Sequence, residues 1–231
     1  MSDNFFPTVF ESTQAEKVVF YKKTYLHVAL SILTFVILEA ILIKIVPEEL
    51  IVAMMGSRLL WLAIIGGFWL LSIVAGKFSV SVDRNTQYAG LGLYIIIESI
   101  IFLPMIYMIM YLSDGGTEVM TQAAIITLFL FSALTAVAFL SKKDFSFLRS
   151  GIIFGGFISL GLIVAGALFG FNLGLWFSVG MVVLAGASIL YQTSNIINKY
   201  NNEQYVGASL ELFASIMLLF WYVLRILNSR K

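Results

Sequence analysis

Residues 24–46 read TYLHVALSILTFVILEAILIKIV, a run in which Glu39 and Lys44 are the only formally charged residues. A helix needs about 20 predominantly apolar residues to cross the hydrocarbon core of a bilayer. The run is also longer than the core of a signal peptide, and it has no small-x-small cleavage site. We therefore expect residues 24–46 to be a transmembrane helix that remains in the mature protein.

The composition of the whole chain agrees with this expectation. Of its 231 residues 60% are hydrophobic and 12% are charged, and the mean hydropathy is +0.97. About a quarter of the residues in a soluble domain are charged, so soluble folds are excluded. A membrane β-barrel would show alternating segments of about ten residues. Instead, six further long apolar runs occur near 58–76, 87–112, 118–140, 149–170, 173–198 and 205–228.

These runs predict an all-α membrane protein, a bundle of seven transmembrane helices. We expect two parts, an amino-terminal arm over 1–23 and a single transmembrane domain over 24–231. Nine of the 14 Lys and Arg residues fall in the arm and in the connections on the same side of the membrane. Because Lys and Arg favour the cytoplasmic side, the arm is predicted to be cytoplasmic, and an odd number of spans places the carboxyl terminus outside.

Several function classes are excluded by what the chain lacks. A net charge of +1 without a basic cluster gives no basis for binding nucleic acid. With no cysteine and a single histidine, His27, the chain cannot build a cysteine-based or multi-histidine metal site. No lysine within 205–228 could form a retinal Schiff base, and every aspartate falls outside the spans. We therefore expect neither an enzyme nor a bound cofactor, and leave open whether the protein binds a metal.

Three acidic residues fall inside the apolar runs. Glu39 lies in the first run, Glu98 near the middle of the third and Glu211 in the last. An ionised group inside a bilayer costs about 2.5–3.5 kcal/mol on insertion scales, so such residues are candidates for moving protons or cations. No basic residue at mid-span would neutralise them, and the neutral, protonated form is favoured. The alternative role, a protonated carboxyl that hydrogen-bonds a neighbouring helix, remains open.

Two polar patches lie toward the predicted cytoplasmic ends of the last two runs. Gln192 and Asn195 stand three residues apart, and Glu211 and Ser215 stand four apart, so each pair shares one helix face. We expect the two patches to meet inside the bundle. There they would form either a closed polar gate or an ordinary network of interhelical hydrogen bonds.

Particular motifs resemble those of the Bax inhibitor-1 (transmembrane Bax inhibitor motif) family, and the resemblance covers nearly the whole chain. The motifs are FYKKTY at 20–25, the segment from Tyr88 to Pro104, KKDFSFL at 142–148 and LRIL at 224–227. The stretch TSNII at 193–197 is similar to the bacterial YccA-like branch. This resemblance implies a central helix surrounded by the others, in the inner membrane of a bacterium.

The resemblance also implies a pH-sensitive leak for calcium ions or protons. The family gates with an aspartate at the end of helix six and another in helix seven, latched by an arginine at the cytoplasmic end of helix two. This chain has Gln192 and Ser215 at the aspartate positions, and the arginine position falls near Ser81. Neither Gln nor Ser titrates in the relevant range, so in our hypothesis Glu98 and Glu211 are relocated acids. The YccA-like branch implies an alternative, a non-enzymatic modulator of the membrane-bound ATP-dependent protease FtsH that acts through the arm.

Overall fold

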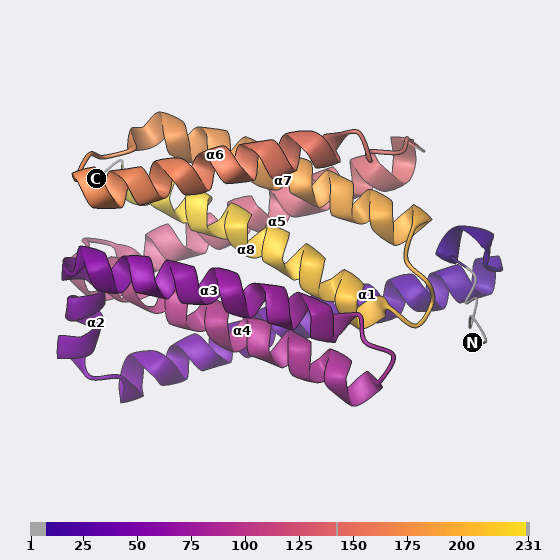
Figure 1. Cartoon of the computed structure of the whole chain (residues 1–231), viewed down its shortest axis with the longest axis horizontal. Coiled ribbons are helices and arrows are strands. Elements are labelled where there is room, and N and C mark those ends of the chain that lie inside the picture. Colours follow the sequence, from indigo (N-terminus) through magenta and orange to yellow (C-terminus); the bar gives the residue numbers. More distant parts are fainter. Residues whose placement is uncertain (1–7, 142, 230–231) are drawn as a thin grey trace.

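A bundle of membrane-length helices makes up the computed structural model, which describes residues 8–141 and 143–229 (Figure 1). In this part of the chain seven helices are long and apolar enough to cross a membrane. They are α1 (Gln14–Ile45), α3 (Arg58–Ser79), α4 (Arg84–Tyr107) with its extension η2 (Met108–Leu112), α5 (Gly116–Ser141), α6 (Leu148–Phe169), α7 (Gly174–Asn198) and α8 (Tyr205–Asn228). The prediction of an all-α bundle with seven spans is confirmed.

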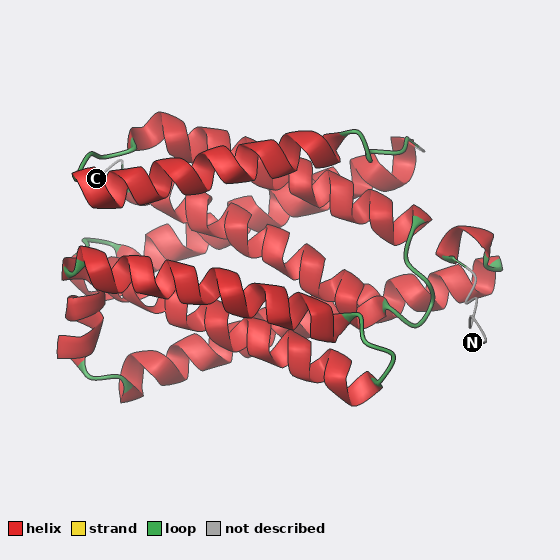
Figure 2. Ribbon diagram, viewed as in Figure 1, coloured by secondary structure: helices red, strands yellow, loops and turns green. Residues whose placement is uncertain are grey.

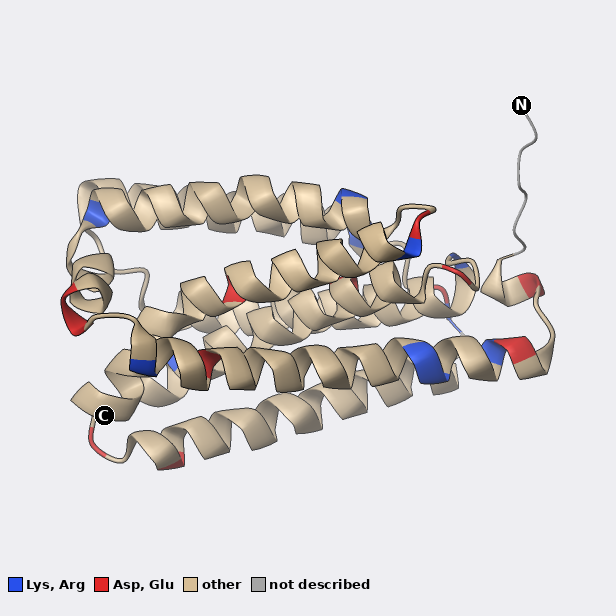
Figure 3. Ribbon diagram, turned by 90° about the horizontal axis from the view of Figure 1, so that it is seen from below, with Lys and Arg blue, Asp and Glu red and all other residues tan. Residues whose placement is uncertain are grey.

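Some residues used in the sequence analysis lie outside the described residues. They are 1–7 of the arm, Lys142 of the KKDFSFL motif, and Arg230 and Lys231 at the carboxyl terminus. The described basic residues gather mainly at the end of the bundle where α1 begins (Figure 3). We call this the amino-terminal end, and the other the opposite end.

The first helix begins ten residues earlier than the expected span. Thr13 and Glu16 form a capping box, in which the Thr13 hydroxyl accepts from the Glu16 backbone N–H and the Glu16 carboxylate accepts from the Thr13 N–H at 2.8 Å. Such reciprocal bonds satisfy the free N–H groups that start a helix. Residue 23 therefore lies inside a continuous helix, and the division into an arm and a transmembrane domain stays a prediction.

Two elements at the opposite end were not predicted. A short helix, α2 (Glu48–Gly56), follows Pro47 and buries Ile51 and Met54. The π-helical segment η2 follows the last turn of α4, which contains Pro104. Proline removes one backbone hydrogen bond from a helix, and π-helical turns are found as local irregularities of α-helices.

Helix α8 runs through the middle of the bundle (Figures 1 and 2), and its span and that of α4 are the most buried. Fully buried side chains of α8 include Phe213, Leu219 and Leu224. The central helix that the resemblance implies is therefore α8. Its two ends lie at the two ends of the bundle, so residues placed along α8 mark depth in the membrane.

The orientation of the bundle in the membrane remains a prediction, and the absence of native cysteines allows a direct test. Lys143 is exposed at the amino-terminal end and Glu118 is exposed at the opposite end. We expect a membrane-impermeant maleimide to label a Glu118→Cys variant in intact spheroplasts. A Lys143→Cys variant should be labelled only after permeabilisation, because the positive-inside rule keeps that loop cytoplasmic. Labelling of Lys143→Cys in intact spheroplasts would reverse the predicted orientation.

Candidate functional site

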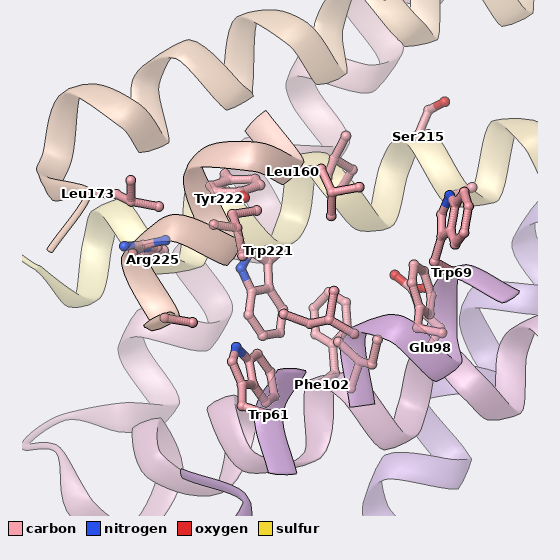
Figure 4. Close-up of a pocket in the computed structure, with 18 of the residues that line it drawn as sticks. Trp61, Trp69, Glu98, Phe102, Leu160, Leu173, Ser215, Trp221, Tyr222 and Arg225 are labelled. Atoms are coloured by element: carbon pink, nitrogen blue, oxygen red, sulfur yellow. The ribbon is translucent and has the colours of Figure 1, made fainter. Parts of the chain in front are cut away.

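A cavity of about 630 Å³ lies between α3 and α6, and residues of α4, α7 and α8 also line it. This volume falls within the range of about 300–1,000 Å³ typical of ligand pockets. Figure 4 shows Arg225 at one end of the cavity, Glu98 and Ser215 toward the other, and Trp61 and Trp221 between them. The cavity therefore extends from the opposite end of the bundle to polar groups near the middle of the spans.

Two of the predicted acids, Glu98 and Glu211, line the inner part of this cavity. Tyr94 lines it as well, and its hydroxyl lies close enough to both carboxyl groups to interact with them electrostatically. Glu39 does not line the cavity, but its carboxyl interacts in the same way with that of Glu98. The structure thus arranges four ionisable side chains in a row across the bundle, from α1 through α4 to α8.

The acids on α1 and α4 are incompletely hydrogen-bonded. Within the described residues, both carboxyl oxygens of Glu39 and one of Glu98 are buried without a hydrogen-bond partner. Leaving a buried polar atom unpaired costs about 1–3 kcal/mol, and more if the group is charged. Because stability alone would disfavour such an arrangement, these two acids stand out as candidates for a functional role.

The two polar patches predicted on α7 and α8 meet. The Gln192 amide donates a hydrogen bond to the Glu211 carboxylate at 3.1 Å, and the Asn195 amide donates to the Gln192 oxygen at 3.3 Å. Ser215 pairs instead with Ser188, whose hydroxyl lies 2.8 Å away. The two positions that carry the family's aspartates therefore have separate partners in this chain.

Beyond these patches a second polar cluster closes the amino-terminal end. Arg84, at the start of α4, pairs with the Glu203 carboxylate in the loop before α8, and also donates to the Glu203 backbone oxygen at 3.1 Å. Its guanidinium lies 4.4 Å from the Tyr205 ring centroid. His27 is 3.0 Å from the Tyr88 hydroxyl, which is 3.3 Å from that of Tyr205. These contacts join α1, α4 and α8 and were not predicted.

The stretches KKDFSFL and TSNII contact one another at the same end. The Ser194 hydroxyl donates to the Asp144 carboxylate at 3.2 Å, and the Phe145 N–H donates to the Ser194 oxygen at 3.0 Å. The hydroxyl and N–H of Ser146 also bond to Asp144 and lower the pKa of that carboxyl. The loop between α5 and α6 is therefore fixed to α7 by side chains that belong to these two motifs.

The family model described as "Inhibitor of apoptosis-promoting Bax1" matches residues 17–231 of the chain. The chain belongs to the Bax inhibitor-1 family. Its curated relatives include an uncharacterized protein of Pseudomonas aeruginosa, 37% identical over 53% of this chain and 55% of that protein. Bax inhibitor 1 of Schizosaccharomyces pombe is 34% identical over 49% of this chain and 43% of its own length.

A viral relative, the Golgi anti-apoptotic protein of Vaccinia virus, is 34% identical over 48% of this chain and 47% of its own length. The chain spans about half the length of the curated relatives it matches. Bacterial proteins stand among these relatives, one of them an uncharacterized membrane protein of Vibrio cholerae, which supports a place in the bacterial branch of the family.

In this Bax inhibitor-1 family member, two residues of the site were missed by sequence analysis. Tyr94 stands one turn before Glu98 on the same face of α4, and Ser188 stands one turn before Gln192 on α7. Each stands four residues from a predicted site residue, and this spacing could have indicated that it lies on the same helix face. The arginine of the amino-terminal cluster, Arg84, lies three residues beyond the position expected for the family's latch and contacts neither Gln192 nor Ser215 by a hydrogen bond.

Proposed function

We propose that this protein is a permease-like leak for calcium ions or protons in a bacterial inner membrane. The observation that carries the proposal is the cavity, which joins Arg225 at the opposite end of the bundle to Glu98 and Glu211 near its middle. Intramembrane acids that line a cavity are typical of ion and proton pathways. The outer half of a pathway would then be present in the described conformation.

The acids have the chemistry that such a pathway needs. A carboxylate offers an oxygen ligand to Ca²⁺, and a protonated carboxyl can pass its proton to a neighbouring acceptor. Glu98 and Glu211 are linked through Tyr94, and Glu39 extends the row toward α1. Conduction favours several weak sites over one tight site, and a row of acids meets that condition.

The hydrogen bond from Gln192 to Glu211 acts as the gate in this proposal. It lies at the inner end of the cavity, and toward the amino-terminal end Ile196 and Val206 are fully buried. The cluster of Arg84, Glu203 and Tyr205 lies farther along the same direction. The described conformation is therefore the closed state of the proposed pathway.

Replacing Gln192 by Ala is expected to raise the leak. The change removes the amide that holds the Glu211 carboxylate, and a net hydrogen bond worth about 1 kcal/mol corresponds to roughly a fivefold shift toward an open state. Ion-sensitive dyes in liposomes measure the flux at a fixed pH. Gln122→Ala is the matched control, because that exposed amide on α5 donates to Glu118 and to no other side chain among the described residues.

The pH midpoint should stay the same in Gln192→Ala, because the acids that titrate remain in place. Equal flux in Gln192→Ala and Gln122→Ala would contradict the gate. Absence of flux from the unaltered protein would instead favour the alternative function, modulation of a membrane-bound ATP-dependent protease.

A further inference from the structure

Two arginines, one in the lining and one beside it, lie near the outer end of the cavity and have no partner among the described residues. Arg58 is exposed at the first residue of α3, and Arg225 lines the cavity in the last turn of α8. Within residues 8–141 and 143–229, neither side chain makes a hydrogen bond or an ion pair. Guanidinium groups left free beside an apolar cavity form a site for an anionic group.

Arg58 does not line the cavity itself, but its side chain lies beside the segment that does. A Cβ atom placed on Gly170 would lie 2.8 Å from a terminal nitrogen of Arg58, so the Arg58 side chain rests on the backbone where α6 ends. Gly170 has a φ of +78°, in the left-handed region that favours glycine. The residues that follow it, Phe171 and Leu173, line the cavity together with Arg225.

The wall between the arginines and the acids is apolar and aromatic. The rings of Trp61 and Trp221 stack with their centroids 6.3 Å apart, and both line the cavity with Arg225. Phe102 and Leu218 continue the lining inward. At 1.5 Å per residue, α8 rises about 21 Å from Arg225 to Glu211. One leaflet of the hydrocarbon core is about 15 Å thick. An acyl chain that begins at Arg225 would therefore reach the level of Ser215 and stop short of Glu211.

We propose that, in the closed conformation, this cavity binds one anionic phospholipid from the leaflet at the opposite end, with its phosphate held by Arg58 and Arg225 and one acyl chain filling the outer half of the pathway proposed above. The arginine fork matches the geometry of a phosphate, and the depth places both arginines at a helix end where headgroups lie. A polar soluble ligand would find few partners along the aromatic wall. Each arginine is expected to favour an anionic over a zwitterionic lipid by about fivefold.

The tryptophans of the chain provide the measurement. Trp61, Trp69 and Trp221 line the cavity, but Trp69 is also 52% exposed and Trp176 is 85% exposed, so these two would report on bulk lipid as well. A Trp69→Phe/Trp176→Phe background therefore leaves only the two informative fluorophores. The protein is reconstituted in nanodiscs of phosphatidylcholine, and its fluorescence is quenched by increasing fractions of brominated phosphatidylglycerol or brominated phosphatidylcholine.

We expect brominated phosphatidylglycerol to quench at several-fold lower mole fraction than brominated phosphatidylcholine. Arg225→Gln and Arg58→Gln should each reduce this preference about fivefold. Arg149→Gln, which removes an exposed arginine at the amino-terminal end, should leave it unchanged. Ala167→Phe, which narrows the cavity without changing its charge, should weaken quenching by phosphatidylglycerol.

Equal quenching by the two brominated lipids would overturn the proposal, as would a preference for phosphatidylglycerol that survives both arginine substitutions. The readout needs no ion flux, so its failure and the failure of the leak function are separate results. Elution as a single species on size-exclusion chromatography confirms that each variant is folded before its quenching is compared.

Discussion

Replacing Glu98 and Glu211 together by Gln is expected to abolish the pH dependence of ion flux in liposomes between about pH 5 and 8, a range in which buried carboxyl groups titrate. Gln keeps the size of Glu and much of its hydrogen bonding but has no proton to lose. If these two acids carry the pH dependence, the flux of the double variant should be the same at pH 5 and at pH 8.

The two single substitutions are expected to change the pH dependence to different extents. Glu98→Gln alone should remove the pH dependence, because Glu98 is the central acid of the row and lies close to both Glu39 and Tyr94. Glu211→Gln should weaken it, since Gln192 still faces that position. Glu118→Gln changes an exposed acid on α5 and should have no effect. A double variant that keeps the pH dependence of the unaltered protein would leave both acids as structural hydrogen-bonding groups.

The largest effect on stability is expected at Gly90, where α4 packs against α3. A Cβ atom at Gly90 would lie 2.6 Å from the Ala75 backbone oxygen and 2.7 Å from the Ser79 nitrogen. Because the obstructing atoms belong to the backbone, the two helices would have to move apart. Gly90→Ala should therefore lower the free energy of unfolding by about 1–3 kcal/mol. Denaturation of the detergent-solubilised protein with SDS measures the change.

Gly92, two residues along the same helix, is the matched control. A Cβ atom there meets nothing within 4 Å, so Gly92→Ala should stabilise the protein by up to about 1 kcal/mol through helix propensity. The two alanine variants are thus expected to change stability in opposite directions. Equal effects at the two positions would mean that the approach of α3 to α4 is looser than described.

The spans could be predicted from the sequence because bilayer thickness sets a minimum length for each apolar run. Features that depend on local chemistry were harder to predict. The capping box of Thr13 and Glu16 was readable in principle, yet the polar residues before Thr24 suggested a separate arm. Helix α2 is only nine residues long, and nothing in its length distinguishes it from a loop.

The contacts between side chains of the candidate site could not be predicted from sequence spacing. Spacing placed Gln192 with Asn195 and Glu211 with Ser215 on shared faces, but it could not say which side chains would face each other. That outcome depends on how α7 and α8 are rotated, which is set by packing along their whole length. The result, Gln192 against Glu211 and Ser215 against Ser188, required the three-dimensional structure.

In our proposal, the row of acids at the inner end of the cavity belongs to an ion pathway. The most direct test is uptake of Ca²⁺ and of protons by liposomes that contain the unaltered protein, measured across the same pH range against protein-free liposomes. We expect a protein-dependent flux of at least one of these ions that changes with pH. Uptake equal to that of protein-free liposomes at every pH would contradict it.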